Sequence, residues 1–211
     1  MEDTLSEDLH LNIIGGKVIA FFELNEDEAY KDFINESAEF KNDLPEFLRD
    51  EIEQGLIPDW FDVEDYVSEC CINEVEQYCK RNPAKYYQTN WCLEFKFPGP
   101  NARYNDGIAN ISSESFEKFI DGFKQGLEKM NSLSKKSFSG LYNKKVGTLD
   151  NPLLEVFSDS DEIVLKFWVY SRTYKFARNL KIRDVTQIIE QLERLPERAS
   201  KLVKNLETIS F

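Results

Sequence analysis

Residue types that serve nucleophilic catalysis are scarce in this sequence. His10 is the single histidine in 211 residues, so a Ser-His-Asp or Cys-His system would depend on it as the base. No G-x-S-x-G sequence is present, and residues 137–140 read Ser-Phe-Ser-Gly without the first glycine. Phosphate-binding loops of the G-x-x-x-x-G-K-[ST] and G-x-G-x-x-G types are also absent. We therefore expect neither a catalytic triad nor a cofactor.

Four cysteines gather in one short part of the chain, at Cys70, Cys71, Cys79 and Cys92. Structural zinc sites usually show paired C-x2-C spacing, which this group lacks, and His10 is distant in sequence. A secreted disulfide framework would be denser and spread along the chain. We predict reduced, mostly buried thiols without a metal, with a zinc site as the alternative.

The sharpest enzymatic motif is Glu94-Phe95-Lys96, with Pro58-Asp59 upstream. These five residues resemble the divided signature of the PD-(D/E)xK nucleases. The resemblance implies that Asp59 and Glu94 hold a divalent metal and that Lys96 lies near the attacked phosphate. The chain would then be a metal-dependent nuclease or another phosphoryl hydrolase.

A structural interpretation competes with this motif and is the one we favour. Glu94 and Lys96 are two residues apart, so on a half-solvated strand both simply face water. Asp59 follows a proline at the predicted start of a helix, where it can act as the cap. An acidic N-terminal half would also repel DNA.

Acidic residues form two clusters that could bind a basic partner. Asp62, Asp65 and Glu69 follow the i, i+3, i+7 spacing of one helix face. Asp50, Glu51 and Glu53 lie on the helix predicted before it. We predict these six residues as a partner-binding surface; the alternative is that they are only the solvated faces of two helices.

The net charge is divided unevenly along the chain. Residues 1–80 carry 23 acidic and 5 basic residues, whereas residues 81–211 carry 16 acidic and 21 basic residues. Such an asymmetry bears on partners rather than on fold, because an acidic surface attracts basic proteins. The charge split and the missing catalytic parts predict an acidic interaction protein of the inhibitor or immunity type, which neutralises a basic, nucleic-acid-handling partner. The alternative is that the acidity only maintains solubility.

Two basic tracts lie in the C-terminal half. Tyr170 and Tyr174 are interleaved with one of them, and basic residues among aromatics can hold single-stranded nucleic acid. We do not expect nucleic-acid contact, for which this tract is the only candidate, because both tracts can also pair with the acidic half or form ordinary wet surface. The tracts are Arg172, Lys175, Arg178, Lys181 and Arg183, and Lys129, Lys135, Lys136, Lys144 and Lys145.

The elements that must position these residues follow from hydrophobic periodicity. Gly15-Gly16 between two apolar runs predicts a hairpin with a two-residue turn. Ser112 or Ser113 is expected to cap a helix, and residues 131–148, rich in Ser, Lys, Asn and Gly, predict a loop. The other expected elements are helices over 25–37, 43–55 and 58–81, strands over 91–97, 107–111, 153–157, 163–170 and 172–182, and a final helix from 183 that Pro196 interrupts.

The predicted core joins one strand to one helix. Alternation places Trp91, Leu93, Phe95 and Phe97 on one strand face, and a period of 3.6 places Phe116, Phe119, Ile120 and Phe123 on one helix face. We expect the two faces to pack together. Gly122 and Gly126 flank the helix stripe, where they would allow close packing.

These elements predict an α+β protein with a mostly antiparallel sheet and helices packed on one face. The strand, connection and helix from residue 91 resemble those from residue 163, which suggests two similar strand-strand-helix units. We expect one domain over 1–211, with sub-lobes 1–130 and 149–211 joined by 131–148 as the alternative. The acidic start and the lack of a long apolar run predict a cytoplasmic protein without a membrane span.

Overall fold

The structure, a computed structural model, describes residues 4–11, 14–36, 49–50, 54, 72–98, 106–135, 140–159, 162–171 and 174–210. They belong to two compact units. The larger unit contains residues 4–21 and 90–210, and the smaller contains residues 22–89. Most of the predicted helix over 43–55 and most of the one over 58–81 lie outside the described residues, as do Cys70 and Cys71.

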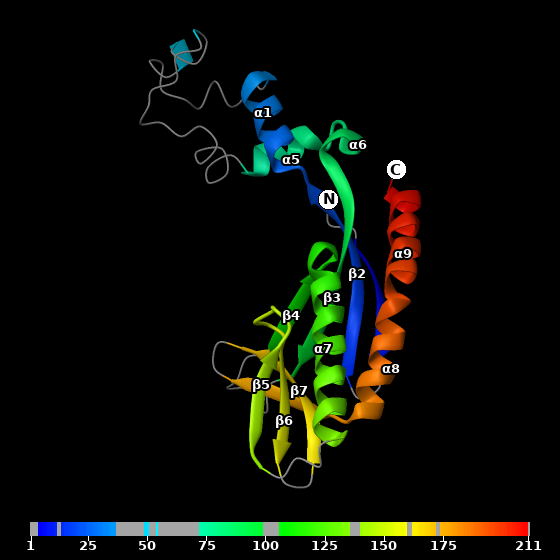
Figure 1. Cartoon of the computed structure of the whole chain (residues 1–211). Helices are drawn as coiled ribbons and strands as arrows, with labels where there is room; N and C mark the ends of the chain where they lie inside the picture. The colour runs from blue at the N-terminus through cyan, green and yellow to red at the C-terminus, as the bar shows by residue number, and fades with distance from the viewer. Residues whose placement is uncertain are drawn as a thin grey trace. The chain divides into compact units, whose positions relative to one another are not determined.

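The first sheet is antiparallel and has the strand order β1-β2-β3-β4 (Figure 1). Its strands are β1 (Thr4–Leu11), β2 (Ile14–Leu24), β3 (Tyr87–Phe97) and β4 (Gly107–Ser112). The hairpin of β1 and β2 was predicted, but its turn was placed wrongly. Leu9 pairs with Gly16 and Leu11 with Ile14, so both glycines lie inside β2. A Cβ on Gly16 would lie 3.0 Å from the carbonyl oxygen of Glu94. Strand β3 therefore approaches β2 so closely at this position that glycine fits best.

The second sheet is also antiparallel, with the order β5-β6-β7-β8. Its strands are β5 (Tyr142–Val146), β6 (Leu153–Asp159), β7 (Glu162–Tyr170) and β8 (Lys175–Leu180). Burial alternates along β6 and β7, and Val156, Phe167 and Val169 point into the core. The period-2 pattern in the sequence therefore located these two strands correctly.

Helix α7 (Phe116–Lys135) packs against both sheets and supplies the centre of the core (Figure 1). The predicted strand-helix packing is confirmed: the ring centroids of Phe95 and Phe119 are 5.6 Å apart, and those of Trp91 and Phe116 are 5.1 Å apart. A Cβ on Gly126 would lie 2.9 Å from Cδ1 of Leu165. The glycine therefore lets α7 approach β7 closely, as the sequence suggested.

Helix α7 begins as predicted and ends later than predicted. The short 3-10 turn η1 (Ser113–Ser115) precedes it, and the Ser112 hydroxyl accepts a hydrogen bond from the Ser115 N–H at 3.3 Å. The stretch 131–148 was predicted as a loop, but it contains the last turn of α7 and all of β5. Strand β5 escaped detection because its central residues are polar and exposed, as suits the edge of a sheet.

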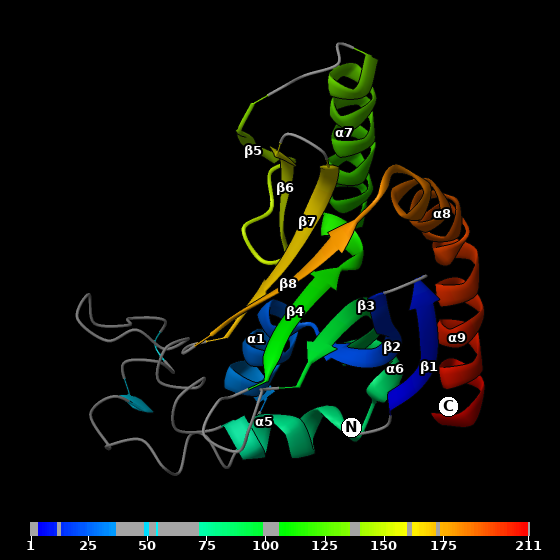
Figure 2. The ribbon, with the colours of Figure 1, turned by 90° about the horizontal axis from the view of Figure 1, so that it is seen from below.

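The C-terminal helices α8 (Ile182–Glu193) and α9 (Leu195–Ser210) lie beside β1 (Figure 2). Asp184 caps α8 by accepting a hydrogen bond from the Lys181 N–H at 2.9 Å. Pro196 stands in the first turn of α9, where a missing N–H is tolerated. An Arg198–Glu7 ion pair joins α9 to β1. Each four-stranded sheet is thus followed by a helix, and the two predicted strand-strand-helix units correspond to β3-β4-α7 and β7-β8-α8.

The smaller unit packs three helices together: α1 (Glu26–Glu36), α5 (Ile72–Cys79) and α6 (Pro83–Tyr86). Helix α5 falls within the predicted 58–81 helix. Phe33, Val75 and Tyr78 contribute to a core separate from that of the larger unit. The Asn25 N–H donates to the Tyr86 carbonyl at 2.8 Å and so ties the start of α1 to the end of α6.

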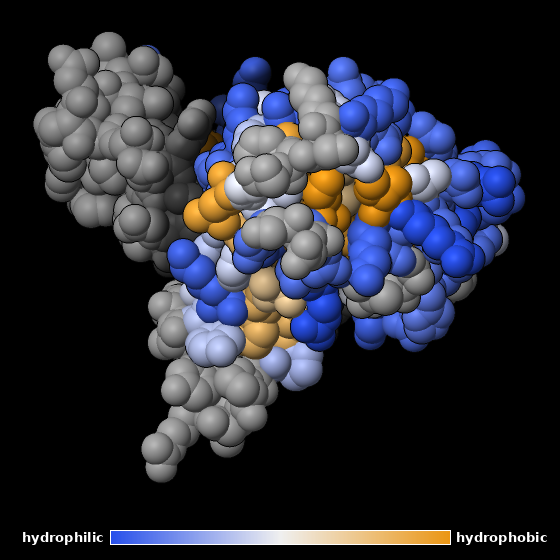
Figure 3. Space-filling model, turned by 60° about the horizontal axis from the view of Figure 1, so that its bottom comes forward, coloured by the Kyte–Doolittle hydropathy of each residue, from blue (hydrophilic) through white to orange (hydrophobic). Residues whose placement is uncertain are grey.

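The architecture confirms the predicted α+β class, with helices and antiparallel sheets in one chain. None of the described helices combines the length and apolar character that crossing a membrane requires. Figure 3 shows one face, on which apolar patches lie between hydrophilic side chains. The exposed large apolar residues of the described chain are Ile108, Leu141 and Tyr174.

Candidate functional site

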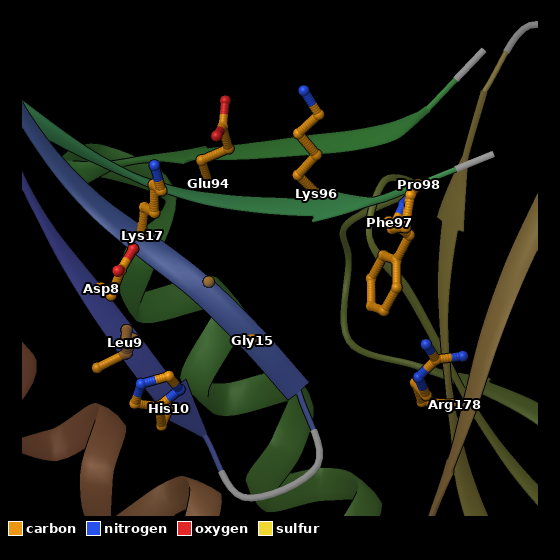
Figure 4. A pocket seen from close by; sticks show the side chains of 11 residues that line it. Asp8, Leu9, His10, Gly15, Lys17, Glu94, Lys96, Phe97, Pro98 and Arg178 are labelled. Atoms are coloured by element: carbon orange, nitrogen blue, oxygen red, sulfur yellow. The ribbon is translucent and has the colours of Figure 1, made fainter. Parts of the chain in front are cut away.

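A cavity of about 520 Å³ opens in the larger unit beside the β1–β2 hairpin and the end of β3. It is lined mainly by charged and small residues. Its lining residues are Asp8, Leu9, His10, Gly15, Gly16, Lys17, Glu94, Lys96, Phe97, Pro98 and Arg178 (Figure 4).

The register of the first sheet brings the polar lining together. Asp8 pairs with Lys17 and His10 with Gly15, so the two strands place their polar side chains side by side. Asp8 and His10 alternate with the buried Leu9, which shows that they share the outer face of β1. The cavity therefore combines the histidine with side chains from a neighbouring strand.

Glu94 and Lys96 of the nuclease-like motif both line this cavity. They point to the same side of β3, whereas Phe97 points to the other side (Figure 4). The Lys96 ammonium lies 3.2 Å from a carboxylate oxygen of Asp106, in an exposed ion pair. Asp59, the third member of the motif, lies outside the described residues. Within the described ranges no three His, Cys, Asp or Glu side chains gather closely enough to hold a metal ion.

Arg178 reaches the cavity from the second sheet. Its guanidinium carbon lies 5.0 Å from the ring centroid of Phe97, which is a cation–π distance. The Phe97 ring also stacks on Phe176, with centroids 6.3 Å apart and planes 13° apart. The aromatic contacts hold the guanidinium at one wall of the cavity.

The cavity can bind a charged ligand. Lys17, Lys96 and Arg178 supply basic side chains, and Asp8 and Glu94 supply carboxylates. A phosphate or carboxylate group on a ligand would meet the cations, and an amino group would meet the acids. This composition favours polar recognition over the binding of an apolar molecule.

Of the six acidic residues predicted to bind a partner, the structure describes Asp50, which is exposed. Glu51, Glu53, Asp62, Asp65 and Glu69 lie outside the described residues.

The basic tract from Arg172 to Arg183 does not form one surface where it is described. Lys175 lies 5.2 Å from the Tyr170 ring centroid, and Lys181 lies 3.5 Å from a Glu162 oxygen. Arg178 belongs to the opposite face of β8 from Lys175, because their positions differ by an odd number of residues. Arg172 lies outside the described residues. Lys175 and Arg178 therefore cannot meet the same ligand from one face of β8.

The smaller unit contains a network of tyrosines and carboxylates that the sequence did not reveal. The Tyr78 hydroxyl donates to Glu36 at 2.8 Å, and the Tyr86 hydroxyl donates to Asp32 at 3.0 Å. Lys85 donates to the same Asp32 oxygen at 2.5 Å. This hydrogen bond from Lys85, followed by the one from Tyr86, lowers the pKa of Asp32, while burial chiefly raises the pKa of Tyr78. The network fixes α1 against α5 and α6, and we assign it a structural role.

Cys79 and Cys92 are free cysteines. Burial raises the pKa of Cys79 to about 11, with smaller contributions from Asp32 and Glu76. Burial, and then Glu94, raise the pKa of Cys92. Because the thiolate is the reactive form, both residues are poor nucleophiles at neutral pH. Cys79 is buried and Cys92 is half-buried, so at these two positions the structure agrees with the predicted free, mostly buried thiols.

Sequence reasoning missed Asp8, Lys17 and Arg178 as neighbours of Glu94. The alternation of polar and apolar residues in β1 was a usable signal for Asp8 and His10. Arg178 gave no such signal, because its contact with Phe97 joins strands of different sheets. Comparison of the chain with protein-family models, curated proteins and solved structures finds no match.

Proposed function

We propose that this chain is an interaction protein whose acidic N-terminal part binds a basic protein. The observation that carries the proposal is the charge split, with 23 acidic against 5 basic residues over 1–80. An inhibitor or immunity-type protein that neutralises a nucleic-acid-handling protein fits this charge, since carboxylates can occupy a surface that normally meets phosphates. The free thiols Cys79 and Cys92 suit a cytoplasmic location.

Helices α1 and α5 offer carboxylates that are available to such a partner. Glu26, Glu28, Glu74 and Glu76 are exposed, and none forms an ion pair with another described residue. Asp32 and Glu36, in contrast, are engaged by Lys85 and Tyr78. Glu28 accepts a hydrogen bond from the Asn25 side-chain amide at 3.3 Å, and Glu26, Glu74 and Glu76 are left directed to solvent.

Long-range charge attraction gives the proposal a kinetic signature. Exposed charges are screened over a Debye length of about 8 Å at physiological salt, so steering weakens as salt is added. The association rate is expected to fall with ionic strength more steeply than the dissociation rate rises. One exposed carboxylate contributes only about 0.2–1 kcal/mol, so several must be reversed together.

The test begins with affinity capture on the wild-type chain and mass spectrometry of the bound proteins. Two charge-reversed triples, D62K/D65K/E69K and E28K/E74K/E76K, should lose the captured partner. The matched control is R172E/K175E/R178E in the basic half, which should retain it. Stopped-flow association at several salt concentrations then measures the steering. If the basic triple abolishes binding while both acidic triples retain it, the functional surface lies in the C-terminal half.

A second candidate, a metal-dependent nuclease or phosphoryl hydrolase, is favoured by the shared cavity of Glu94, Lys96, Lys17 and Arg178. In that case Glu94 and Asp59 would hold Mg²⁺, and the metal would polarise the phosphate and activate water. Hydrolysis of bis-p-nitrophenyl phosphate with and without Mg²⁺ tests it. Glu94→Gln should abolish a Mg²⁺-dependent rate, whereas Glu117→Gln, on the exposed surface of α7, should not. Absence of any Mg²⁺-dependent hydrolysis by the wild type rejects this candidate.

A further inference from the structure

A second groove lies in the larger unit, between α7 and the edge strand β5. It has a volume of about 440 Å³. One wall is a single helix face at the i, i+3, i+4, i+7 spacing, and the other is β5 with the residue that follows it. The wall residues are Gln125, Glu128, Lys129 and Ser132 of α7, and Lys144, Lys145, Val146 and Gly147.

Three lysines give this groove its charge. Lys144 is exposed and has no ion-pair partner among the residues that the structure describes. Lys129 lies 5.0 Å from the Tyr142 ring centroid, a contact that orients the ammonium without neutralising it. Lys145 is held by Asp150 at 2.5 Å, and Glu128 is the single acid of the lining. Lys129 and Lys144 therefore remain available to an anionic ligand.

Besides the lysines, strand β5 offers backbone N–H and C=O groups to a ligand. In the described sheet it pairs with β6 on one side and with no strand on the other (Figure 1). The open side of an edge strand presents N–H and C=O groups that can pair with an added strand. Leu141, directly before β5, is 75% exposed and offers an apolar contact at the same edge.

We propose that this groove binds an extended acidic peptide segment, which adds to the sheet beside β5. Backbone hydrogen bonds to the open edge would supply affinity, and carboxylates on alternate residues would meet Lys129 and Lys144. An extended strand fits because its side chains alternate, so that one row faces the groove. This basic groove is distinct from the acidic surface proposed above: the groove takes an acidic segment, whereas the acidic surface takes a basic protein.

Lysines on an edge strand also have a simpler role, since they discourage unwanted pairing between sheets. That role requires charge on β5 alone. It does not require a cation on α7 facing the same groove, nor an apolar residue left exposed at the end of the strand. The placement of Lys129 opposite β5 is what favours a ligand.

The test uses a fluorescein-labelled octapeptide of alternating Glu and Val, with fluorescence anisotropy as the readout on the full chain. We expect saturable binding that weakens as salt is added. Lys129→Glu combined with Lys144→Glu should weaken it about tenfold or more, because two attractive charges become repulsive. Lys118→Glu, at an exposed position of α7 outside this groove, is the control and should change binding less than about twofold. Circular dichroism and thermal unfolding verify that each variant is folded.

Two further arms separate strand addition from simple charge attraction. An octapeptide of alternating Glu and Pro has the same charge, but its prolines lack backbone N–H groups. It should bind much more weakly, and amides of β5 should exchange more slowly only with the Glu-Val peptide. Equal binding of both peptides, or no binding of either, overturns the proposal. So does tighter binding of an oligo-dT octamer that the double variant abolishes, because the groove would then be a nucleic-acid site.

Discussion

Gly147 and Gly122 meet backbone to backbone where β5 ends against α7. A Cβ on Gly147 would lie 2.9 Å from the Cα of Gly122, and a Cβ on Gly122 would lie 3.5 Å from the Cα of Gly147. Gly147 also has a φ of +74°, a conformation that side-chain-bearing residues rarely adopt. The contact sets how closely the second sheet approaches the central helix.

Gly147→Ala should therefore lower the free energy of unfolding by about 2–4 kcal/mol, through backbone strain together with overpacking. Gly15→Ala is the control, because a Cβ there meets nothing within 4 Å. Urea titration of both variants gives the comparison. Equal midpoints for the two variants would show that the β5–α7 junction adapts without cost.

Substitution of Phe95 tests the assigned core. Phe95 is fully buried and contacts Phe119 and Phe167, with ring centroids at 5.6 Å and 5.0 Å. Phe95→Ala should cost about 3–5 kcal/mol of stability, because it leaves a cavity between α7 and both sheets. Ile108→Ala on the outer side of β4 should cost within about 0.5 kcal/mol. Chemical denaturation measures both, and a small loss at Phe95 would contradict the assigned core.

Cys79 should resist alkylation in the folded chain. Burial raises the pKa of its thiol to about 11 from an ordinary value near 9, so the thiolate fraction at pH 8 falls about a hundredfold. Iodoacetamide labelling followed by peptide mass spectrometry gives the rate at this residue alone. The same labelling in urea serves as the reference. Similar rates in both conditions would mean that Cys79 is accessible.

Asp32 should couple stability to acidic pH. Its pKa is lowered in the folded chain, chiefly by the hydrogen bond from Lys85. A carboxyl of this kind stabilises the folded state above its unfolded pKa, near 3.8, and loses that contribution as the pH falls through the lower folded pKa. The urea midpoint of the wild type should thus fall below about pH 4 more steeply than that of Asp32→Asn. Asp8→Asn, on the outer face of β1, provides the comparison. Parallel curves for Asp32→Asn and the wild type would show that the hydrogen bond from Lys85 to Asp32 does not stabilise the folded chain.

The core was predictable from sequence because it rests on local periodicity. Alternation located Phe95, and the helical period located Phe119, so each face was visible within a few residues of chain. Strand β5 was not predictable in this way. Asn143, Lys144 and Lys145 are exposed on an edge strand, where packing places little demand on hydrophobicity.

The candidate site was harder to predict than the core. Glu94 and Lys96 were recognisable as a local sequence motif. The residues that lie beside them in the cavity are set by the pairing between strands, which a local motif does not show. Reading Gly15-Gly16 as the turn moved the hairpin register away from the observed pairing of Asp8 with Lys17. Arg178 becomes part of the cavity lining through its contact with Phe97, which joins the two sheets. A contact of this kind leaves no local pattern in the sequence.

The packing of α9 on β1 bears on the order in which the chain can fold during synthesis. Leu9 and Leu11 leave the ribosome early, whereas Leu195 and Ala199, members of the same core, emerge long afterwards. Until then the apolar face of β1 has no cover from α8 or α9, and exposed apolar strands are prone to aggregate. A nascent chain halted before residue 182 should consequently be a substrate for chaperones that shield its first hairpin.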